Sequence, residues 1–475
     1  MVGHDDAKVD KWLSARVKEH DRMFDLLAHP DMPVQVSMLL LRMCMLPKMG
    51  YLARVTPPNL LLPHAKAFDL RILNTAKRRL GLPNQLPDVA ISTLQLPIRL
   101  GGFGFRPVSL VSLAAFWSAA AQATRDIVEF IPAQKHKSLL YEPASYLPFA
   151  ANVYAAHKML LSAGVQSGSN SILPSKPEGF WALYGKDGPE RKLQRVLCGM
   201  MEAKKLVSLT ESFASSKRDL QRLESLGSRN AGAWLTAYPS TPDLSLSNSD
   251  FCLAARLRLG LPAYDDLPEL CACNETLEVD PAHFMSCRLL RGGAVTERHN
   301  MLVRLLAQLF RTNAGAAVRI TPKIFDTVRM IPDLQVIRAE GDLFVDVVVS
   351  HPAAPSRGTT RALAVSGYAS KAKHKRYGEM VEARGAQLLA FAVDSFGAFS
   401  KEAMEVVKSL RAGADGSIFR TLSSSTAGSP VLLLDLPAER QCLRYEERGT
   451  RESPAGGEMG WSNISPATPI SAKKS

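Results

Sequence analysis

Four residues in the second half of the chain carry its clearest metal-binding chemistry: Cys271, Cys273, His283 and Cys287. They follow the pattern C-x-C-x9-H-x3-C. Three thiolates and one imidazole form a ligand set that structural Zn²⁺ accepts in tetrahedral geometry. His283 and Cys287 also have the spacing that brings two side chains to one side of a helical turn. The alternative is that these are ordinary small buried residues, but their clustering favours a structural zinc site.

Two aspartates occur where strands are expected. Asp333 precedes the apolar segment LQVI, and Asp346 interrupts the run FVDVVV. Burying a carboxylate is costly unless it binds a metal or has a polar partner, so a functional interpretation of Asp346 is reasonable. The alternative is that the alternation of side chains along a strand points Asp346 to solvent.

A lysine-rich segment, ASKAKHKRYGEM at 369–380, follows the two aspartates. We expect it to be helical, with Lys373 and Tyr377 on one face. Two carboxylates and a lysine that meet at the edge of a sheet can bind Mg²⁺, orient a water molecule and stabilise the charge that develops on a phosphodiester under attack. These side chains therefore predict metal-dependent phosphodiester chemistry.

A basic helix is expected just before the aspartates, because leucines recur at helical spacing in TERHNMLVRLLAQLF at 296–310. Between 288 and 323 the arginines oppose a single acid, Glu297. The arginines of this stretch are Arg288, Arg291, Arg298, Arg304, Arg311 and Arg319. Such an excess suits a DNA-backbone surface better than a salt-bridged helix. The alternative is an ordinary solvated helix face.

A small α/β unit is needed to position these residues. Short apolar runs separated by a turn predict a β-hairpin followed later by a buried strand, and helical spacing predicts the helices between them. In chain order we expect a helix at 296–310, hairpin strands at 331–337 and 343–350, a helix at 369–380, a strand at 387–393 and a helix at 396–410.

Most of the chain before the cysteines is predicted to be helical. Apolar residues recur with helical spacing from 7 to 54, and a helix at 64–80 has one apolar stripe. The run LGGFGF predicts a tight backbone turn. Residues 126–230 are helical and charged without a motif that indicates chemistry. Residues 413–475, rich in Ser, Pro, Gly and Thr, are expected to be mostly disordered.

The overall composition favours a nucleic-acid partner. The chain has 475 residues, enough for two or three domains, and a formal charge of +13. A basic balance gains affinity for phosphates by releasing counterions, although it can also serve solubility alone. Seven cysteines are too few for a disulfide scaffold and indicate a reducing compartment. We expect neither a signal peptide nor a transmembrane segment, and no membrane partner.

The C-terminal pattern resembles the PD-(D/E)XK nuclease superfamily, with Pro332-Asp333 as the first motif and Asp346 as the second acid. The lysine of the second motif should follow two residues after that acid, where this chain has Val348. In the restriction-enzyme-like endonuclease of site-specific non-LTR retrotransposons the lysine comes from the next helix, in a K-x-x-(K/R)-Y signature. Lys373-His-Lys-Arg376-Tyr377 is similar to it. The resemblance implies that Lys373 is catalytic, with Lys371 and Lys375 as close rivals.

The same retroelement family places a C-C-H-C cluster before the endonuclease and an R-H dipeptide after that cluster, similar to Arg298-His299. Upstream, AKAFDLRILNTAKRRLGLP and LQLPIRLGGFGFRP resemble the thumb that follows the palm of these reverse transcriptases. The expected division is a thumb-like helical region (1–125), a helical linker or scaffold (126–265), the CCHC unit (266–290), the endonuclease domain (291–412) and the tail (413–475).

The resemblance implies a nuclear protein that binds target DNA and element RNA, holds structural Zn²⁺ and catalytic Mg²⁺, and nicks target DNA to prime reverse transcription. Asp333 and Asp346 would hold the Mg²⁺. The nucleic-acid-binding candidates are Arg291, Arg298, His299, Arg304, Arg311, Lys371 and Lys375. The alternative is a catalytically decayed fragment of the retroelement polyprotein that still binds DNA or RNA.

Polymerase activity is not expected. Reverse transcription needs paired aspartates on a palm hairpin, usually within Y-x-D-D, and no such pair precedes the thumb-like region. Tyr264-Asp265-Asp266 lacks the intervening residue and lies in a proline-rich connection, so we interpret it as a surface turn. We therefore expect a truncated copy or gene fragment without its palm.

Overall fold

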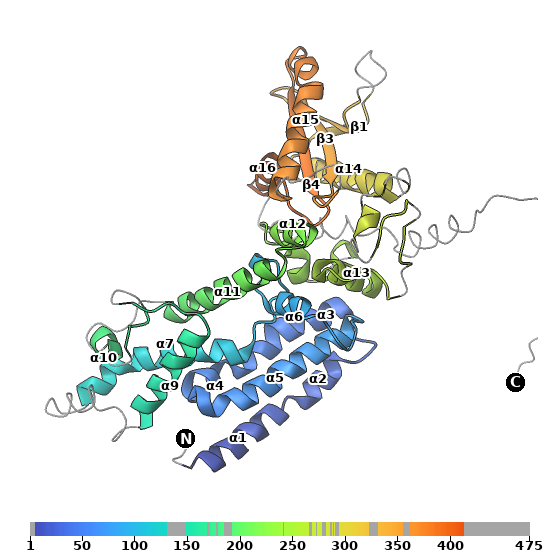
Figure 1. The fold of residues 1–475 in the computed structure, drawn as a ribbon. Helices are drawn as coiled ribbons and strands as arrows, with labels where there is room; N and C mark the ends of the chain where they lie inside the picture. The colour runs from blue at the N-terminus through green and yellow to red at the C-terminus, as the bar shows by residue number, and fades with distance from the viewer. Residues whose placement is uncertain are drawn as a thin grey trace, which may run out of the picture.

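The structure is a computed structural model, and the part of the chain that it describes is mostly helical (62%) with a small four-stranded mixed sheet. It describes residues 5–130, 148–168, 172–176, 179–184, 192–240, 242–265, 268–271, 273–277, 282–285, 287, 289, 294–322, 331–354 and 362–412. The tail expected at 413–475 lies outside the described residues. Figure 1 shows the N-terminal helices at the bottom, α12 and α13 in the middle, and the sheet with its helices at the top.

The part of the chain before the cysteines is helical, as predicted. Its helices are α1 (Asp6–Lys18), α2 (Asp21–Leu27), α3 (Val34–Leu40), α4 (Gly50–Val55), α5 (Pro58–Arg79), α6 (Asp88–Gln95), α7 (Val108–Phe130), α9 (Pro148–Ser162), α10 (Gly179–Tyr184), α11 (Leu193–Ser212), α12 (Lys217–Leu226) and α13 (Asn248–Leu259). Short turns of helix are η1 (Leu41–Met45), η2 (Leu46–Met49), η3 (Ile98–Leu100), η4 (Ala233–Thr236), η5 (Pro242–Leu244) and η6 (His283–Met285).

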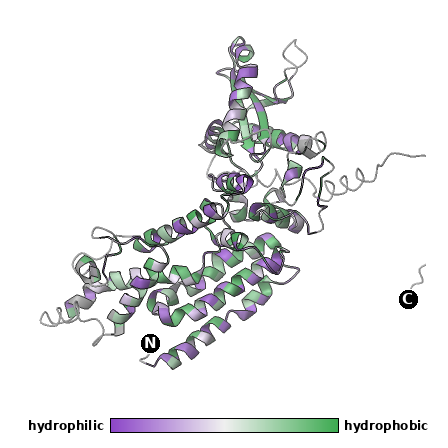
Figure 2. Cartoon of the chain, in the orientation of Figure 1, coloured by the Kyte–Doolittle hydropathy of each residue, from purple (hydrophilic) through white to green (hydrophobic). Residues whose placement is uncertain are grey.

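The predicted apolar stripe of α5 is buried. Phe68, Ile72, Ala76 and Leu80 are at most 2% exposed and face the first hydrophobic core. The helix begins earlier than expected, at Pro58, because a proline at the first helical position has no amide hydrogen bond to lose and already has helical φ. Figure 2 shows the resulting alternation of hydrophobic and hydrophilic residues along the N-terminal helices.

The glycine-rich run forms the predicted tight turn. Gly101 and Gly104 have φ values of 88° and 80°, which favour glycine. A Cβ on Gly102 would lie 2.0 Å from the carbonyl oxygen of Leu96, so this position has no room for a side chain. The guanidinium of Arg258 donates to the Gly102 carbonyl and ties the turn to α13.

The two largest hydrophobic cores of the described helical part join residues from both of its predicted ranges. Residues of the expected linker, 126–265, contribute to both. Trp234 and Phe251 pack edge to face, with ring centroids 4.9 Å apart, in the same core as α5. The second core joins α7, α9, α10 and α11 around Trp117. Burial of apolar surface thus joins segments that are distant in the sequence, which composition along the chain does not indicate.

The C-terminal unit contains the sheet. Its elements are α14 (Ala294–Asn313), β1 (Ala317–Ile320), β2 (Leu334–Ile337), β3 (Leu343–Ser350), α15 (Ala362–Glu382), β4 (Gln387–Asp394) and α16 (Lys401–Ala412). The strand order is β1-β2-β3-β4, antiparallel except for the parallel pair of β3 and β4. The predicted hairpin, buried strand and helices are present, and strand β1 is additional to the prediction.

The two faces of β3 have different coverings. Val345 and Val347 pack in one core with Leu302 of α14 and Val406 of α16. Successive strand residues point to opposite faces, so Phe344 and Asp346 point to the face covered by α15, where Phe344 packs against Tyr377. This alternation directs the carboxylate of Asp346 toward the lysine-bearing helix.

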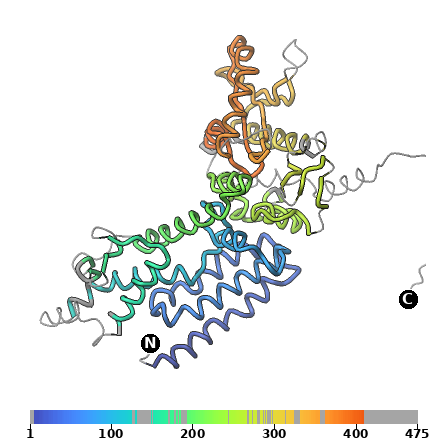
Figure 3. The backbone as a smooth tube through the Cα atoms, in the orientation of Figure 1, coloured from blue at the N-terminus to red at the C-terminus, as the bar shows by residue number. Residues whose placement is uncertain are grey.

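Helix α12 connects the N-terminal helices to the sheet. The Ser225 hydroxyl donates to the Asp394 carboxylate at the end of β4, and the amide of Ala362 donates to Glu224 at 2.9 Å. Leu226 and Met285 pack with Phe396, from the loop after β4. The tube in Figure 3 shows the green α12 and α13 segments between the blue N-terminal helices and the orange C-terminal unit.

One helical stretch, Val34–Val55, is long and apolar enough to cross a membrane by length and composition alone. Its buried residues, among them Met38, Leu41 and Met45, pack in the first hydrophobic core.

Candidate functional site

The hairpin brings the two predicted aspartates opposite each other. Leu334 of β2 is paired with Val345 of β3. One step further in this antiparallel register, Asp333 is opposite Asp346. The Asp333 carboxylate accepts from the Val347 amide of β3, directly after Asp346, so the two acids lie beside each other at this end of the hairpin. The amide of Thr321 after β1 donates to the Asp333 carbonyl at 2.8 Å and holds this end of the hairpin.

Asp346 is buried and forms an ion pair with Lys373. Only 3% of its side chain is exposed, and its Oδ2 lies 2.5 Å from the Lys373 Nζ. The prediction that Lys373 and Tyr377 share a face of the helix agrees with their geometry, because the ammonium lies 5.9 Å from the Tyr377 ring centroid. The alternative that Asp346 points to solvent is wrong in this structure.

The pKa of Asp346 is raised to about 6: burial is the largest cause and the nearby Asp333 adds to it, whereas the hydrogen bond and charge of Lys373 lower the pKa. The ion pair with Lys373 therefore does not fully offset the cost of burying the ionised Asp346 carboxylate. A cation placed close to a buried carboxylate stabilises its ionised form.

Asp333 is held by the backbone of β3 and by His299. The amide of Val347 donates to the Asp333 Oδ2 at 2.7 Å. The Nε2 of His299 lies 3.2 Å from this same oxygen and 3.2 Å from the Val347 carbonyl. The hydrogen bond to Asp333 raises the pKa of His299, and burial opposes it. His299 thus lies at the carboxylate site, with 30% of its side chain exposed, and its contact with nucleic acid stays a prediction.

The other predicted basic residues divide into three groups. Arg304, Arg311, Lys371 and Lys375 are exposed, as a nucleic-acid surface requires. Arg291 lies outside the described residues. The prediction that Arg298 belongs to the exposed basic face is wrong: it is 5% exposed, and burial lowers its pKa to about 10. The pattern of charges in the sequence does not indicate that the side of α14 carrying Arg298 is covered by other parts of the fold.

The structure brings the four predicted metal ligands together. The loop after Cys271 turns back through Asn274, whose φ is 67°, and the Cys271 amide donates to the Glu275 carbonyl at 2.9 Å. The Cys287 amide donates to the carbonyl of His283 at 2.9 Å, so these two residues lie on one helical turn, as predicted. The ligand atoms of Cys271, Cys273, His283 and Cys287 all lie within 4.8 Å of one another.

The ligand atoms of this Cys/His cluster lie close enough together to share a single metal ion. The sulfurs of Cys271 and Cys287 are 3.6 Å apart, close to the separation of about 3.8 Å between two thiolates of a tetrahedral zinc site. The Cys273 sulfur lies 3.0 Å from the His283 Nε2, shorter than the separation of about 3.5 Å expected in such a site. The cluster can therefore hold a metal ion. Among the described residues it is the one group of three or more Cys, His, Asp or Glu side chains whose potential ligand atoms lie this close together.

Glu402, which our sequence analysis did not single out, lies beside the lysine-bearing helix. Its carboxylate accepts from the Ser370 hydroxyl at 2.7 Å, from the His374 Nε2 at 3.0 Å and from the Ala390 amide at 3.0 Å. The signal in the sequence is weak: Ser400, which caps α16 by accepting from the Ala403 amide, and an acid in the first turn mark only a helix start.

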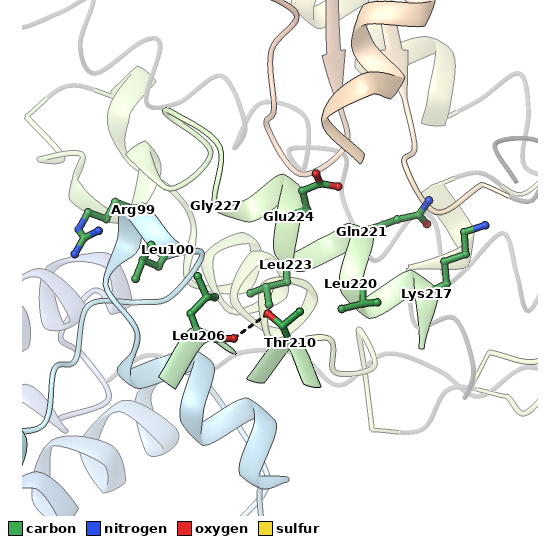
Figure 4. Close-up of a pocket in the computed structure, with 10 residues that line it drawn as sticks. All are labelled: Arg99, Leu100, Leu206, Thr210, Lys217, Leu220, Gln221, Leu223, Glu224 and Gly227. Atoms are coloured by element: carbon green, nitrogen blue, oxygen red, sulfur yellow. Dashed lines mark hydrogen bonds between the residues drawn. The ribbon is translucent and has the colours of Figure 1, made fainter. Parts of the chain in front are cut away.

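A groove of about 520 Å³ lies away from the carboxylates and the cysteines. Figure 4 shows that η3, α11 and α12 line it with four leucines and several polar side chains, and that Thr210 donates to the Leu206 carbonyl. Its one carboxylate, Glu224, already accepts from Ala362. The lining thus lacks the paired acids, thiols or imidazoles that hydrolytic chemistry needs, and the carboxylate cluster remains the candidate catalytic site.

No protein-family model matches this chain, and no curated protein matches it.

Proposed function

We propose that this chain is a retrotransposon-derived, nucleic-acid-binding protein whose C-terminal unit is a Mg²⁺-dependent DNA endonuclease that nicks target DNA to prime reverse transcription. The observation that carries the proposal is the ion pair between Lys373 on α15 and the buried Asp346 on β3, with Asp333 opposite on the hairpin. The pattern has the residue types of the PD-(D/E)XK site, with the lysine supplied by the following helix. DNA and element RNA are the proposed partners, and the nucleus is the proposed location.

The residues present fit a Mg²⁺ ion. This ion is usually held by one or two carboxylates and completes its shell with water and substrate phosphates, so Asp333 and Asp346 are a sufficient protein ligand set. When bound, Mg²⁺ supplies positive charge that stabilises the developing charge on the phosphate and activates a water molecule.

The side chains of this site have separable roles in the proposed reaction. Lys373 neutralises part of the charge of Asp346 and supplies an ammonium beside the carboxylates, where negative charge develops on the scissile phosphate. The water oxygen forms a bond to phosphorus and loses a proton to solvent, while the bond to the 3′ oxygen breaks, the phosphate stays on the 5′ side and the 3′ oxygen takes up a proton from solvent. The free 3′ hydroxyl that results is the end that a reverse transcriptase extends.

Two other features support the proposal that the chain binds nucleic acid: exposed basic residues and the Cys/His cluster. The exposed Arg304, Arg311, Lys371 and Lys375 provide charges that can contact phosphates without reading sequence. The Cys/His cluster is proposed to bind structural Zn²⁺, which would fix the fold of the segment between α13 and α14.

Nicking of supercoiled plasmid in the presence of Mg²⁺ tests the proposal. We expect cleavage by the wild-type chain and loss of cleavage by Asp333→Asn and Asp346→Asn. Glu340→Gln is the matched control, because Glu340 lies on the same hairpin with 68% of its side chain exposed. Equal cleavage by all four proteins would indicate a contaminating nuclease and refute the proposal. DNA binding without cleavage by the wild type would instead support a decayed binding fragment.

A further inference from the structure

Glu402 makes contacts that a surface helix start does not require. It lies in the first turn of α16, and 28% of its side chain is exposed. Its two oxygens accept hydrogen bonds from three groups, the Ser370 hydroxyl, the His374 imidazole and the Ala390 amide. An acid that only complemented the helix dipole would need none of these partners.

These contacts join β4 to α15 at the level of the carboxylate site. Ala390 is the register partner of Asp346 in the parallel pair of β3 and β4. Ser370 and His374 are one helical turn apart, so Glu402 holds one side of α15 at two points. The sheet position that carries Asp346 and the helix that carries Lys373 are therefore fixed to each other through one carboxylate.

The position and rotation of α15 determine where the Lys373 backbone lies and in which direction its side chain leaves the helix. Lysine has a long stem with many rotamers, and it reaches one partner reproducibly only when its backbone is held in place. Lys373 directly precedes His374, and its ammonium lies 2.5 Å from the Asp346 Oδ2. A rotation of α15 about its axis would move the ammonium away from this carboxylate.

We propose that Glu402 is a positioning residue for Lys373: by bonding Ser370, His374 and Ala390 it sets the rotation of α15 that brings the lysine to Asp346. Glu402 is not assigned a metal, because both of its oxygens already accept hydrogen bonds. The catalytic consequence of this role rests on the proposed endonuclease function, but the geometric role does not.

A measurement on Lys373 itself tests the geometric role without any activity. The full chain is treated briefly with a limiting amount of an amine-reactive acetylating reagent, and the acetylation rate of each lysine is measured by mass spectrometry. In Glu402→Ala we expect Lys373 to react about fivefold faster than in the wild type, because α15 loses its contacts with Glu402 and the ion pair between Lys373 and Asp346 is weakened. Glu402→Gln, which retains an acceptor for the Ala390 amide and can bond Ser370, should restore most of the protection. Glu405→Ala, an exposed change on the same helix, should leave the rate unchanged.

The nicking assay then tests the catalytic consequence. We expect Glu402→Ala to lower kcat about 10- to 100-fold with little change in KM, since a small displacement of a catalytic group has effects of this size. Glu402→Gln should recover most of the rate. If the wild-type chain does not nick DNA, the proposed function fails while the acetylation result still decides the role of Glu402.

A second variant separates positioning from folding. Ser370→Ala removes one contact from α15 but keeps the bond between Glu402 and Ala390. We expect a partial increase in Lys373 acetylation, and the double variant Ser370→Ala/Glu402→Ala should react no faster than Glu402→Ala alone, because both changes remove the same contact. Wild-type Lys373 reactivity in a folded Glu402→Ala protein, or fully additive effects in the double variant, would overturn the proposal.

Discussion

The Lys373 ammonium lies 2.5 Å from the buried Asp346 carboxylate, although the two residues come from a helix and a strand separated by a long stretch of chain. Asp346 is only 2% exposed, so this lysine is the cationic partner that makes its burial tolerable. Removing one member of a buried pair leaves the other charge uncompensated, which costs more than the pair contributes. Both activity and stability should therefore depend on this contact.

The three lysines of the segment should differ in their effect on nicking. We expect Lys373→Ala to lower kcat at least about 100-fold, because it removes the charge beside the carboxylates. Lys371→Ala and Lys375→Ala should keep kcat and weaken DNA binding, since both lysines are exposed on α15. Steady-state kinetics on a plasmid substrate separate the two effects. A lower kcat in Lys371→Ala or Lys375→Ala than in Lys373→Ala would assign the chemistry to a different lysine.

Nicking should depend on pH through Asp346. Its pKa is raised to about 6, chiefly by burial, so the carboxyl group is protonated below that pH and ionised above it. The protonated form binds neither metal nor lysine well. We expect the rate to rise with pH and then level off near neutrality, with a fall of about tenfold per pH unit below the pKa. Initial rates at Mg²⁺ concentrations well below saturation, where the metal-free carboxyl group titrates, check this, and a flat profile down to about pH 5 would contradict it.

Asp394, which accepts from Ser225 at the contact between α12 and the end of β4, should make the stability of the fold depend on pH. Burial raises its pKa to about 6, so the folded protein holds this proton more tightly than the unfolded chain does. Asp394 therefore contributes most to stability when the pH is below its pKa in the unfolded chain. This contribution is lost as the pH rises through its pKa in the folded protein. Across this pH range the free energy of unfolding changes by about 3 kcal/mol at most through Asp394.

The variant Asp394→Asn isolates this contribution. An asparagine can still accept from the Phe396 and Ala398 amides and can bond the Ser225 hydroxyl. We expect the variant to be at least as stable as the wild type at neutral pH and relatively less stable in mild acid. Urea unfolding at several pH values gives the difference. Ser225→Ala, which removes a partner, should instead destabilise the protein throughout, and parallel pH curves for wild type and Asp394→Asn would rule out the assignment.

Metal removal should unfold the Cys/His cluster segment. Cys287→Ser replaces one of four ligands, and we expect it to abolish stoichiometric zinc and to lower stability by several kcal/mol. The change should also weaken the packing of Met285 on Phe396, and with it the contact to the sheet. Elemental analysis and thermal unfolding measure both effects. Cys44→Ser is the control, because Cys44 is an exposed thiol outside the cluster; an equal loss in both variants would exclude a metal-specific effect.

The local elements of the site could be predicted from the sequence because their signals lie in neighbouring residues. The apolar run around Asp346 indicates a strand, the turn before it indicates a hairpin, and the spacing of His283 and Cys287 indicates one helical turn. Each of these patterns depends on the period of a helix or a strand, which is a property of the backbone alone. Metal-ligand chemistry at the cysteines follows from residue types and close spacing in the same way.

The tertiary structure decided what depends on long-range packing. It selected Lys373 among three lysines as the partner of Asp346, buried Arg298, placed His299 against Asp333 and revealed Glu402 as the link between β4 and α15. The rotation of α15 and the covering of α14 result from contacts between segments far apart in the chain. A local pattern specifies that a helix forms and which residues share a face, but the direction of that face is set by what packs against it.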